Sequence, residues 1–431
     1  MDEVNTTADP SGPALNDGAP PGCGPLLPGP PLDPKPLRQK IFEHIRAVGF
    51  AARADVTRAL GVSAGSVTQL TSDLIAQGYL READDPHKPP LRDRRESGRG
   101  RPSVALCVVP GAHRVIGIKL SDERHTAVLA DFAGNILAEA MLPTPPVRKS
   151  LDQICDETAT LIARVLAEAG LGLDDVAAVG IGISGLVEPA DGHIPWSPLL
   201  NAANLPLRAA LTQRIGRPVL VENDANMLTL AELWFGAGRA TSDFAVVTIE
   251  HGVGMGLVLG NRLYRGTRGM GMEFGHTKVH LDGALCRCGQ RGCLEAYLAD
   301  YALAREAATA LDRNPRNLVS PQAMLESLFA EAKGGNLAAR SIFRRAGRYL
   351  ALGLSNVIQL FDPELIILSG ERMRYDYLYA DEVIGETLTL TLDHGRKPCR
   401  IEIHAWGDMV WARGAAALAL AHVTDTVMGA A

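Results

Sequence analysis

Hydrophobic and polar positions change their spacing along the chain, and this change divides the chain into parts. Residues 1–34 are rich in Pro and Gly and lack apolar periodicity, which predicts a disordered tail. From Leu37 onward apolar residues recur every three or four positions, which predicts a helix. A short helix is expected over residues 54–60 and a third over 63–77, with Ser63 as its N-cap. The first folded part should therefore be a three-helix domain.

The third predicted helix has an apolar side and a polar side. Val67, Leu70, Leu74 and Ile75 should point inward, and small polar residues, Thr71 among them, should occupy the other sides. Two strand-like segments follow, separated by an arginine-rich loop, which completes the layout of a winged helix-turn-helix. Hydroxyls and amides suit the major groove, and an Arg-Gly-Arg-Pro loop suits a narrow minor groove. The residues expected to contact DNA are Ser63, Ser66, Thr68, Gln69, Ser72, Arg94, Arg95, Arg99 and Arg101.

Charge is distributed unevenly between the beginning of the chain and the rest. Residues 35–104 contain thirteen Lys or Arg and eight Asp or Glu, a net charge of +5, whereas the whole chain carries −6. A basic part joined to an acidic body indicates that only the first part meets a polyanion. Three-helix units also mediate protein contacts, however, and an arginine-rich run is often only a solvated surface.

From Arg114 onward strand-like and helix-like segments alternate, which predicts an α/β body. Residues 115–120 and 126–137 are expected to pair as a hairpin. No run approaches the eighteen apolar residues that a membrane helix needs, and the first residues lack the pattern of a secretory signal. A cytoplasmic protein without a membrane partner is therefore expected.

Three of the seven cysteines lie close together in the sequence GHTKVHLDGALCRCGQRGCLE. Disulfides are rare in a reducing cytosol, so a metal site is the better prediction. His276, Cys286, Cys288 and Cys293 supply an imidazole and three thiolates, the tetrahedral ligand set of structural Zn²⁺. Neighbouring glycines let the chain turn tightly around an ion. The alternative is a group of unrelated free thiols.

The sequence CRCGQRGCLE, preceded by EFGHT, resembles the signature of the ROK family of sugar kinases and sugar-responsive transcriptional repressors. The resemblance extends from about residue 35 to the C-terminus and is to the repressor branch. It implies a winged helix-turn-helix followed by a two-lobed, actin-like and ribonuclease-H-like α/β body. The expected parts are a tail (1–34), a DNA-binding domain (35–110), a first lobe (111–235), and a second lobe (236–431) whose last helix could return to the first.

The resemblance also implies which residues hold a sugar. Asn223 and Asp224 match a sugar-contacting Asn and the Asp that acts as the base in the kinases. Glu273, His276 and Glu295 match the remaining hydroxyl-binding side chains. His276 would serve the metal through one ring nitrogen and the sugar through the other. Zinc would then hold a loop so that these side chains stay aimed at one monosaccharide.

Both phosphate loops of the ROK kinases are changed in this chain. GIKLSDER stands at the first, with Lys119 where kinases have Asp, and residues 250–254 read EHGVG at the second. A carboxylate about 4 Å from a phosphate charge costs about 4 kcal/mol at a dielectric of about 20. General-base catalysis by Asp224 supplies about 10²- to 10⁴-fold, a comparable or smaller free energy. Kinase activity is expected to be lost and the sugar pocket kept.

Together these patterns predict a sugar-responsive repressor that binds operator DNA as a homodimer or tetramer. Its effector would be a monosaccharide or a derivative, and its cofactor structural Zn²⁺. Two other functions remain open, namely an active ROK sugar kinase and a regulator that docks on a protein while its pocket is vestigial.

Overall fold

A computed structural model gives the structure of the 431-residue chain. None of the described helices is long and apolar enough to cross a membrane. The residues that the structure describes are 20–27, 29, 35–83, 104–269, 271–310, 321–370, 381–392, 394, 395 and 397–429.

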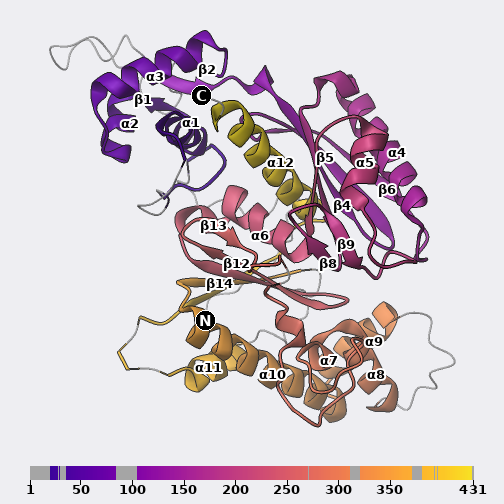
Figure 1. Ribbon diagram of the computed structural model, residues 1–431. Coiled ribbons are helices and arrows are strands. Elements are labelled where there is room, and N and C mark those ends of the chain that lie inside the picture. The colour runs from indigo at the N-terminus through magenta and orange to yellow at the C-terminus, as the bar shows by residue number, and fades with distance from the viewer. Residues whose placement is uncertain are drawn as a thin grey trace. The chain divides into compact units, whose positions relative to one another are not determined.

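The described residues form two compact units (Figure 1). The N-terminal unit contains residues 20–242, 260–262 and 408–429, so the end of the chain folds with its beginning. The C-terminal unit contains residues 243–259 and 263–407. Each unit has its own five-stranded sheet.

The N-terminal unit begins with a helical domain, defined as the described part of residues 37–108. Ile41, Ile45, Val67 and Leu74 are fully buried and form its core, as the apolar periodicity predicted. The three strands pair antiparallel in the order β1-β3-β2. The elements are α1 (Leu37–Val48), β1 (Ala51–Ala52), α2 (Arg53–Leu60), α3 (Ala64–Ala76), β2 (Leu80–Ala83) and β3 (Ala105–Val108).

The rest of the N-terminal unit is a mixed α/β lobe with the strand order β10-β7-β4-β5-β6. The apolar run predicted as one hairpin arm is interrupted at Gly134, where φ is +92°, so it forms β5 and the start of β6. The elements are η1 (Pro110–Ala112), β4 (Arg114–Leu120), β5 (Arg124–Asp131), β6 (Ile136–Pro143), α4 (Leu151–Ala169), η2 (Leu173–Asp175), β7 (Ala178–Ile183), β8 (Leu186–Glu188), β9 (His193–Trp196), α5 (Leu207–Ile215), β10 (Val219–Asn223), α6 (Asp224–Phe235), η3 (Ala237–Ala240) and α12 (Val410–Gly429).

The C-terminal unit is a second mixed α/β lobe, with the strand order β13-β12-β11-β14-β15. The buried faces of its sheet and helices share one apolar core that includes Val247, Phe274, Phe343 and Leu354. The elements are β11 (Phe244–Ile249), β12 (Val253–Leu259), β13 (Arg262–Tyr264), η4 (Phe274–His276), α7 (Glu295–Leu298), α8 (Asp300–Ala310), α9 (Pro321–Lys333), α10 (Leu337–Phe361), β14 (Leu365–Ser369), α11 (Asp381–Leu390) and β15 (Arg400–His404).

The two large sheets have the same topology. In each, the first strand pairs antiparallel with the second and parallel with the fourth, and the fifth strand lies outside the fourth. The third strand lies outside the second in both. This repetition agrees with the expectation of a two-lobed α/β body, and it places the turns β4–β5 and β11–β12 at corresponding positions of the two sheets.

The C-terminal helix α12 packs unusually closely on the sheet of the N-terminal unit (Figure 1). Gly117 and Gly180 are paired neighbours on β4 and β7. A Cβ atom at either position would lie 2.0 Å from a backbone oxygen of α12, that of Ala412 or Ala415. Only glycine therefore allows the helix backbone to approach the sheet this closely.

The helical domain is joined to its lobe by a set of contacts that we call the domain junction. The rings of Phe42 and Phe132 lie 4.9 Å apart, and His113 packs edge-on against Phe132 at 4.9 Å. The buried guanidinium of Arg46 lies over Trp234 and donates to Thr424 Oγ1 of α12 at 2.8 Å. These contacts join α1 to the residue that follows β5, to α6 and to α12.

Residues 20–27, which we call the strap, also belong to the junction. Cys23 is 3% exposed, and its backbone N–H donates to Arg46 O at 3.1 Å. The backbone N–H groups of Gly24 and Leu26 donate to Trp234 O and Arg239 O, both at 2.8 Å. The disordered tail expected over residues 1–34 therefore differs from what is seen in this segment. Apart from the strap and residue 29, residues 1–34 lie outside the described part of the chain.

Candidate metal centre and sugar-binding residues

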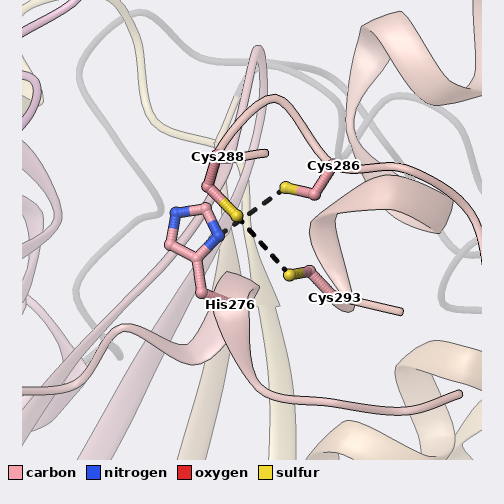
Figure 2. A group of neighbouring side chains, drawn as sticks. All are labelled: His276, Cys286, Cys288 and Cys293. Atoms are coloured by element: carbon pink, nitrogen blue, oxygen red, sulfur yellow. Dashed lines mark hydrogen bonds between the residues drawn. The ribbon is translucent and has the colours of Figure 1, made fainter. Parts of the chain in front are cut away.

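The four predicted metal ligands lie together in the C-terminal unit (Figure 2). His276 ends the short helix η4, and the three cysteines come from the loop that precedes α7. The ligand atoms of all four lie within 4.8 Å of one another. Cys288 Sγ lies 3.7 Å from Cys293 Sγ, and Cys286 Sγ lies 3.7 Å from His276 Nδ1.

These distances fit a tetrahedral zinc ion. With Zn–S bonds of about 2.3 Å at tetrahedral angles, two sulfur ligands lie about 3.8 Å apart. Cys286 and Cys293 are buried, and Cys288 is exposed. The set supplies one nitrogen and three sulfurs without a further oxygen ligand, which is the composition of closed structural sites. The cluster predicted from spacing is therefore assembled in three dimensions and could hold a metal.

The chain around the cluster turns where glycine is required. Gly292 has φ +74°, and a Cβ atom there would lie 1.7 Å from His280 O. No side chain larger than hydrogen fits this position, so the loop can fold back toward Cys293 only with glycine. The backbone N–H of Gly292 donates to Ala284 O at 2.9 Å, which closes the loop on itself.

A cation and a phenol surround the sulfur atoms. Lys278 Nζ donates to Cys293 Sγ at 2.9 Å, and this hydrogen bond raises the pKa of Lys278 above its usual value. Tyr301 Oη donates to Cys286 Sγ at 3.5 Å and to Glu295 Oε1 at 3.3 Å. Three thiolates around one Zn²⁺ would leave an excess of negative charge, which the Lys278 ammonium would offset.

The C-terminal unit also holds three of the five predicted sugar-binding residues. Glu273 is exposed and directly precedes η4, and His276 N donates to Glu273 O at 3.0 Å. Glu295 begins α7, where its carboxylate accepts from Val253 N at 3.4 Å. His276 directs Nδ1 toward Cys286, so Nε2 is on the other side of the ring. His276 and Glu295 therefore lie against the metal cluster and Glu273 adjoins His276, and their role in sugar binding stays a prediction.

The other two predicted sugar-binding residues belong to the N-terminal unit, where β10 meets α6. Asn223 is the N-cap of α6; its side-chain oxygen accepts from Ala225 N at 2.8 Å and its amide donates to Gly185 O at 2.8 Å. Asp224 Oδ2 accepts a 2.5 Å hydrogen bond from Ser184 Oγ. The structure assembles the residues within each unit, and the combination of all five into one sugar site stays a prediction.

Ser184 was missed in the sequence analysis. It follows the buried strand β7 directly, and its hydroxyl holds the carboxylate of Asp224. Ser197 Oγ in turn donates to Ser184 O at 2.7 Å. A polar residue at the end of a buried parallel strand was the available signal, because ligand-binding groups gather at the carboxyl ends of such strands.

The turn β4–β5, which replaces the first phosphate loop, is closed by a buried histidine. Ser121 N donates to His125 Nδ1 at 3.1 Å, so the ring hydrogen is on Nε2, which donates to Glu157 at 2.9 Å. His125 is fully buried, and burial lowers its pKa. Lys119 Nζ lies 3.4 Å from the centre of the Trp411 ring on α12. The backbone N–H of Ser121 and the ammonium of Lys119 thus already have partners within the protein.

The turn β11–β12, which replaces the second phosphate loop, is closed differently. Glu250 N donates to Gly252 O at 2.9 Å, and His251 Nδ1 lies 3.0 Å from the buried carboxylate of Asp300. Asp300 N donates to Glu250 O at 3.3 Å, which ties the turn to the start of α8. An acidic side chain and a histidine held by a buried carboxylate therefore occupy a turn that would need to receive phosphate in a kinase.

The predicted DNA-contacting residues of the third helix lie on or just before α3. Ser63 caps the helix by accepting from Ser66 N at 3.1 Å, as predicted. Thr68, Gln69 and Ser72 are exposed, and Ser66 is half-buried. The other four residues of the predicted DNA-contacting set, Arg94, Arg95, Arg99 and Arg101, lie outside the described residues.

Thr71 is not on the polar side of this helix, contrary to the sequence analysis. It is fully buried beside Val67 and Leu74, and its hydroxyl donates to Val67 O at 2.7 Å while accepting from Arg53 Nε at 3.0 Å. A threonine can be buried in this way because one backbone oxygen and one guanidinium satisfy its hydroxyl.

Two mixed α/β lobes of one topology, one of them carrying a His-Cys₃ cluster, agree with the resemblance to the ROK family that the sequence indicates. The model of the ROK family matches residues 115–422, more than half of the chain. The chain belongs to the ROK family. The family predicted from the cysteine motif is thereby confirmed.

Relatives of known kind include both regulators and enzymes. The xylose repressor of Caldicellulosiruptor bescii is 25% identical over 341 residues, which cover 77% of this chain and 82% of the repressor. A ROK family transcriptional regulator, a homologue of the Escherichia coli MLC protein, has a similar fold, with a TM-score of 0.74 at 23% identity, over 91% of this chain and 96% of its own. A ROK glucokinase from Streptomyces griseus, solved with glucose and AMPPNP, has a TM-score of 0.60 at 30% identity. The match covers 71% of this chain and 99% of the glucokinase chain. The match to a repressor over most of both chains supports the repressor branch.

Proposed function

We propose that this protein is a transcriptional repressor that binds operator DNA through its helical domain and is controlled by a monosaccharide or a sugar derivative. The observation that carries the proposal is the capped helix α3, which presents an exposed polar side in a chain that belongs to the ROK family and is similar to a xylose repressor. A regulator of this kind acts in the cytoplasm.

In this proposal the helical domain is a winged helix-turn-helix and α3 is its recognition helix. Buried Val67 and Leu74 fix one side of α3 to the domain core, which leaves the opposite side for the major groove. Paired recognition helices read half-sites one or more helical turns apart, so the DNA-bound form would be a symmetric homodimer or tetramer.

The sugar would be bound by Asn223, Asp224, Glu273, His276 and Glu295, with Zn²⁺ as a structural ion. The ion would keep Glu295 and His276 in place, because both lie against the cysteine loop. Binding can change DNA affinity only if the sugar has different affinities for the DNA-competent and DNA-incompetent states. Whether the sugar releases the repressor or recruits it is decided by the sign of that difference.

Loss of kinase activity is the second part of the proposal. The kinases use backbone N–H groups of both turns to approach phosphate, and here the N–H groups of Ser121 and Glu250 already have protein acceptors. The Glu250 carboxylate adds like-charge repulsion at the second turn. Asp224 retains the position of the base that takes the proton from the sugar hydroxyl. Without a bound phosphate donor, however, no phosphoryl group is available for that hydroxyl.

The test of DNA binding is a selection of genomic fragments on the purified full-length protein, followed by titration in the absence and presence of a panel of monosaccharides and sugar phosphates. The expected result is one enriched palindromic sequence whose affinity changes at least fivefold with one of the sugars. Absence of sequence-specific binding under every condition would overturn the proposal. If the protein binds one DNA sequence but no sugar binds the protein or alters its affinity for DNA, a regulator that docks on another protein replaces the sugar-controlled repressor.

The similarity to a glucokinase keeps an active sugar kinase as the second candidate. A coupled ATP assay over the same sugars separates the two. The proposal expects no sugar-dependent turnover from the wild-type chain. Turnover that is abolished in Asp224→Asn, while sugar binding measured by calorimetry is retained, would establish the kinase instead.

A further inference from the structure

The exposed side of α3 has one side chain that differs from its neighbours. Gln69 is two residues after Val67, which places it about 200° around the helix and almost opposite the buried face. The other exposed residues on this side are Gly65, Ser72, Asp73 and Ala76. All four side chains are shorter than that of Gln69, so Gln69 extends furthest from the helix at the centre of its exposed side.

The hydroxyls of Thr68 and Ser72, which flank Gln69, already use their hydrogens, and so does one of the hydroxyls of Ser63 and Ser66. Thr68 Oγ1 donates to Ala64 O, and Ser72 Oγ donates to Thr68 O, both at 2.8 Å. Ser66 Oγ lies 2.8 Å from Ser63 Oγ. Among the described residues none is hydrogen bonded to the Gln69 side chain. Its amide can therefore offer a donor and an acceptor together, which the hydroxyls of Thr68 and Ser72 cannot do without breaking an existing hydrogen bond.

The chemistry of this amide selects one base. Bidentate recognition of guanine requires Arg or Lys, and α3 contains neither. Asn or Gln makes two hydrogen bonds to adenine, donating to N7 and accepting from the N6 amino group. We propose that Gln69 reads one adenine in each operator half-site. This inference rests on the proposed function, because it takes α3 to be the recognition helix.

The test compares DNA selected from a random library by three full-length proteins: wild type, Gln69→Ala and Gln77→Ala. The control removes the same amide at the C-cap of α3, where Gln77 is bound by Arg38. Wild type and the control should both enrich adenine at one position of each half-site, and Gln69→Ala should lose the preference at that position alone. Its affinity for the wild-type site should fall about 5- to 150-fold.

A second measurement makes the base assignment specific. Replacing that adenine by 7-deazaadenine removes the N7 acceptor and should weaken wild-type binding but leave Gln69→Ala unchanged. The inference is overturned if the position lost in Gln69→Ala is not adenine, or if Gln69→Ala selects the wild-type sequence. Failure of the wild-type protein to select any sequence would instead overturn the proposed function, and this inference with it.

The strap carries a separate inference. Arg239 is 2% exposed, and its guanidinium donates to three backbone oxygens: those of Gly24 at 3.1 Å, Pro20 at 2.9 Å and Ala47 at 2.6 Å. Two of these oxygens belong to the strap and the third to the end of α1. A buried cation satisfied by carbonyls of two segments holds both segments in one position. From this we infer that the strap locks the helical domain to its lobe, so that α3 moves with the lobe as one body.

Cys23 provides a reporter of strap docking, because its thiol donates to Ala133 O at 3.1 Å inside the junction. Alkylation by N-ethylmaleimide, mapped by peptide mass, should label wild-type Cys23 at least tenfold more slowly than Cys23 in urea. Gly134→Ala introduces a Cβ atom 2.3 Å from Cys23 Sγ. Arg239→Met removes the guanidinium, and Arg214→Met is the matched control on the exposed surface of the same unit.

Gly134→Ala and Arg239→Met should each raise the rate at which Cys23 is alkylated at least tenfold, and the control Arg214→Met should leave this rate unchanged. Hydrogen exchange of α1 should rise in the same two variants. The inference is overturned if wild-type Cys23 reacts as fast as in urea. It is equally overturned if Gly134→Ala and Arg239→Met, both folded by circular dichroism, leave Cys23 protected and α1 exchange unchanged.

Discussion

The metal loop and the domain junction are held together by opposite kinds of contact. The four metal ligands lie within residues 276–293, on one loop of the C-terminal unit. At the junction, Arg46 and Thr424 are 378 residues apart, and Gln39 and Asp425 are 386 residues apart. With little core of its own, the loop of residues 276–293 is expected to depend on a bound ion, whereas the junction is stabilised by buried rings and hydrogen bonds. The spacing of ligands along one loop can therefore be predicted from the sequence, whereas packing between distant segments cannot.

The largest effect on stability is expected from loss of the metal. Cys293→Ser, or exhaustive chelation, should remove zinc and lower the thermal stability of the C-terminal unit, because apparent zinc-binding free energies in small zinc peptides are about 10–16 kcal/mol. Elemental analysis and calorimetry measure the two quantities. Cys399→Ser, a cysteine outside the cluster, should keep about one zinc per chain. An unchanged unfolding midpoint after complete metal removal would contradict a structural role.

The junction should respond to the loss of one ring. Phe132 is fully buried between Phe42 and His113, so Phe132→Ala should cost about 3–5 kcal/mol of the free energy of unfolding. Urea unfolding followed by tryptophan fluorescence measures this, because Trp196, Trp234 and Trp411 belong to the N-terminal unit.

The matched control for the junction is Leu137→Ala on β6, whose side chain is 44% exposed. It should change the free energy of unfolding by less than about 1 kcal/mol. If Phe132→Ala costs no more than this control, the junction is not the packed interface described here. Neither variant should change the zinc content, which keeps the two regions distinguishable.

A smaller effect is expected at the edge of the metal loop. Lys278→Ala removes the ammonium from Cys293 Sγ and should weaken zinc affinity about tenfold, since groups that support metal ligands typically contribute 10- to 100-fold. Competition with a chromophoric chelator measures the affinity. Arg291→Ala, which removes an exposed cation bonded to Gly283 O in the same loop, is the control and should have little effect. Equal losses in both variants would indicate a general charge effect.

The smallest effect is a dependence on pH in the N-terminal unit. Burial lowers the pKa of His125 and of His113 below the value of about 6.5 that they have when unfolded. Between the folded pKa values and about pH 6.5 the unfolded chain binds more protons than the folded one, so this contribution to the free energy of unfolding is fully present above about pH 6.5 and is lost as the pH falls through the folded pKa values. Urea midpoints read from tryptophan fluorescence between pH 5 and 8 test this, and His125→Gln should flatten the profile. A midpoint that rises on acidification would contradict it.

Much of the local structure could be predicted because its causes are local. The cap at Ser63, the buried positions Val67 and Leu74, and the metal ligands all follow from spacing along one helix or loop. The same reasoning failed for Thr71, whose burial depends on Arg53 from another helix. It also failed for the strap, because Pro-Gly composition shows only that a segment lacks its own core, not that another surface will receive it.

The sequence by itself determined the ligand set of the metal loop, the capped polar helix and the loss of both phosphate-loop patterns, because each depends on residues a few positions apart. Only the tertiary structure decided that α12 and the strap pack beside α1, that Ser184 holds Asp224, and that Glu157 of α4 bonds His125 of the first turn. These contacts bring together residues that are remote in sequence. Their formation depends on which surfaces bury together, a property of the whole chain that no local pattern contains.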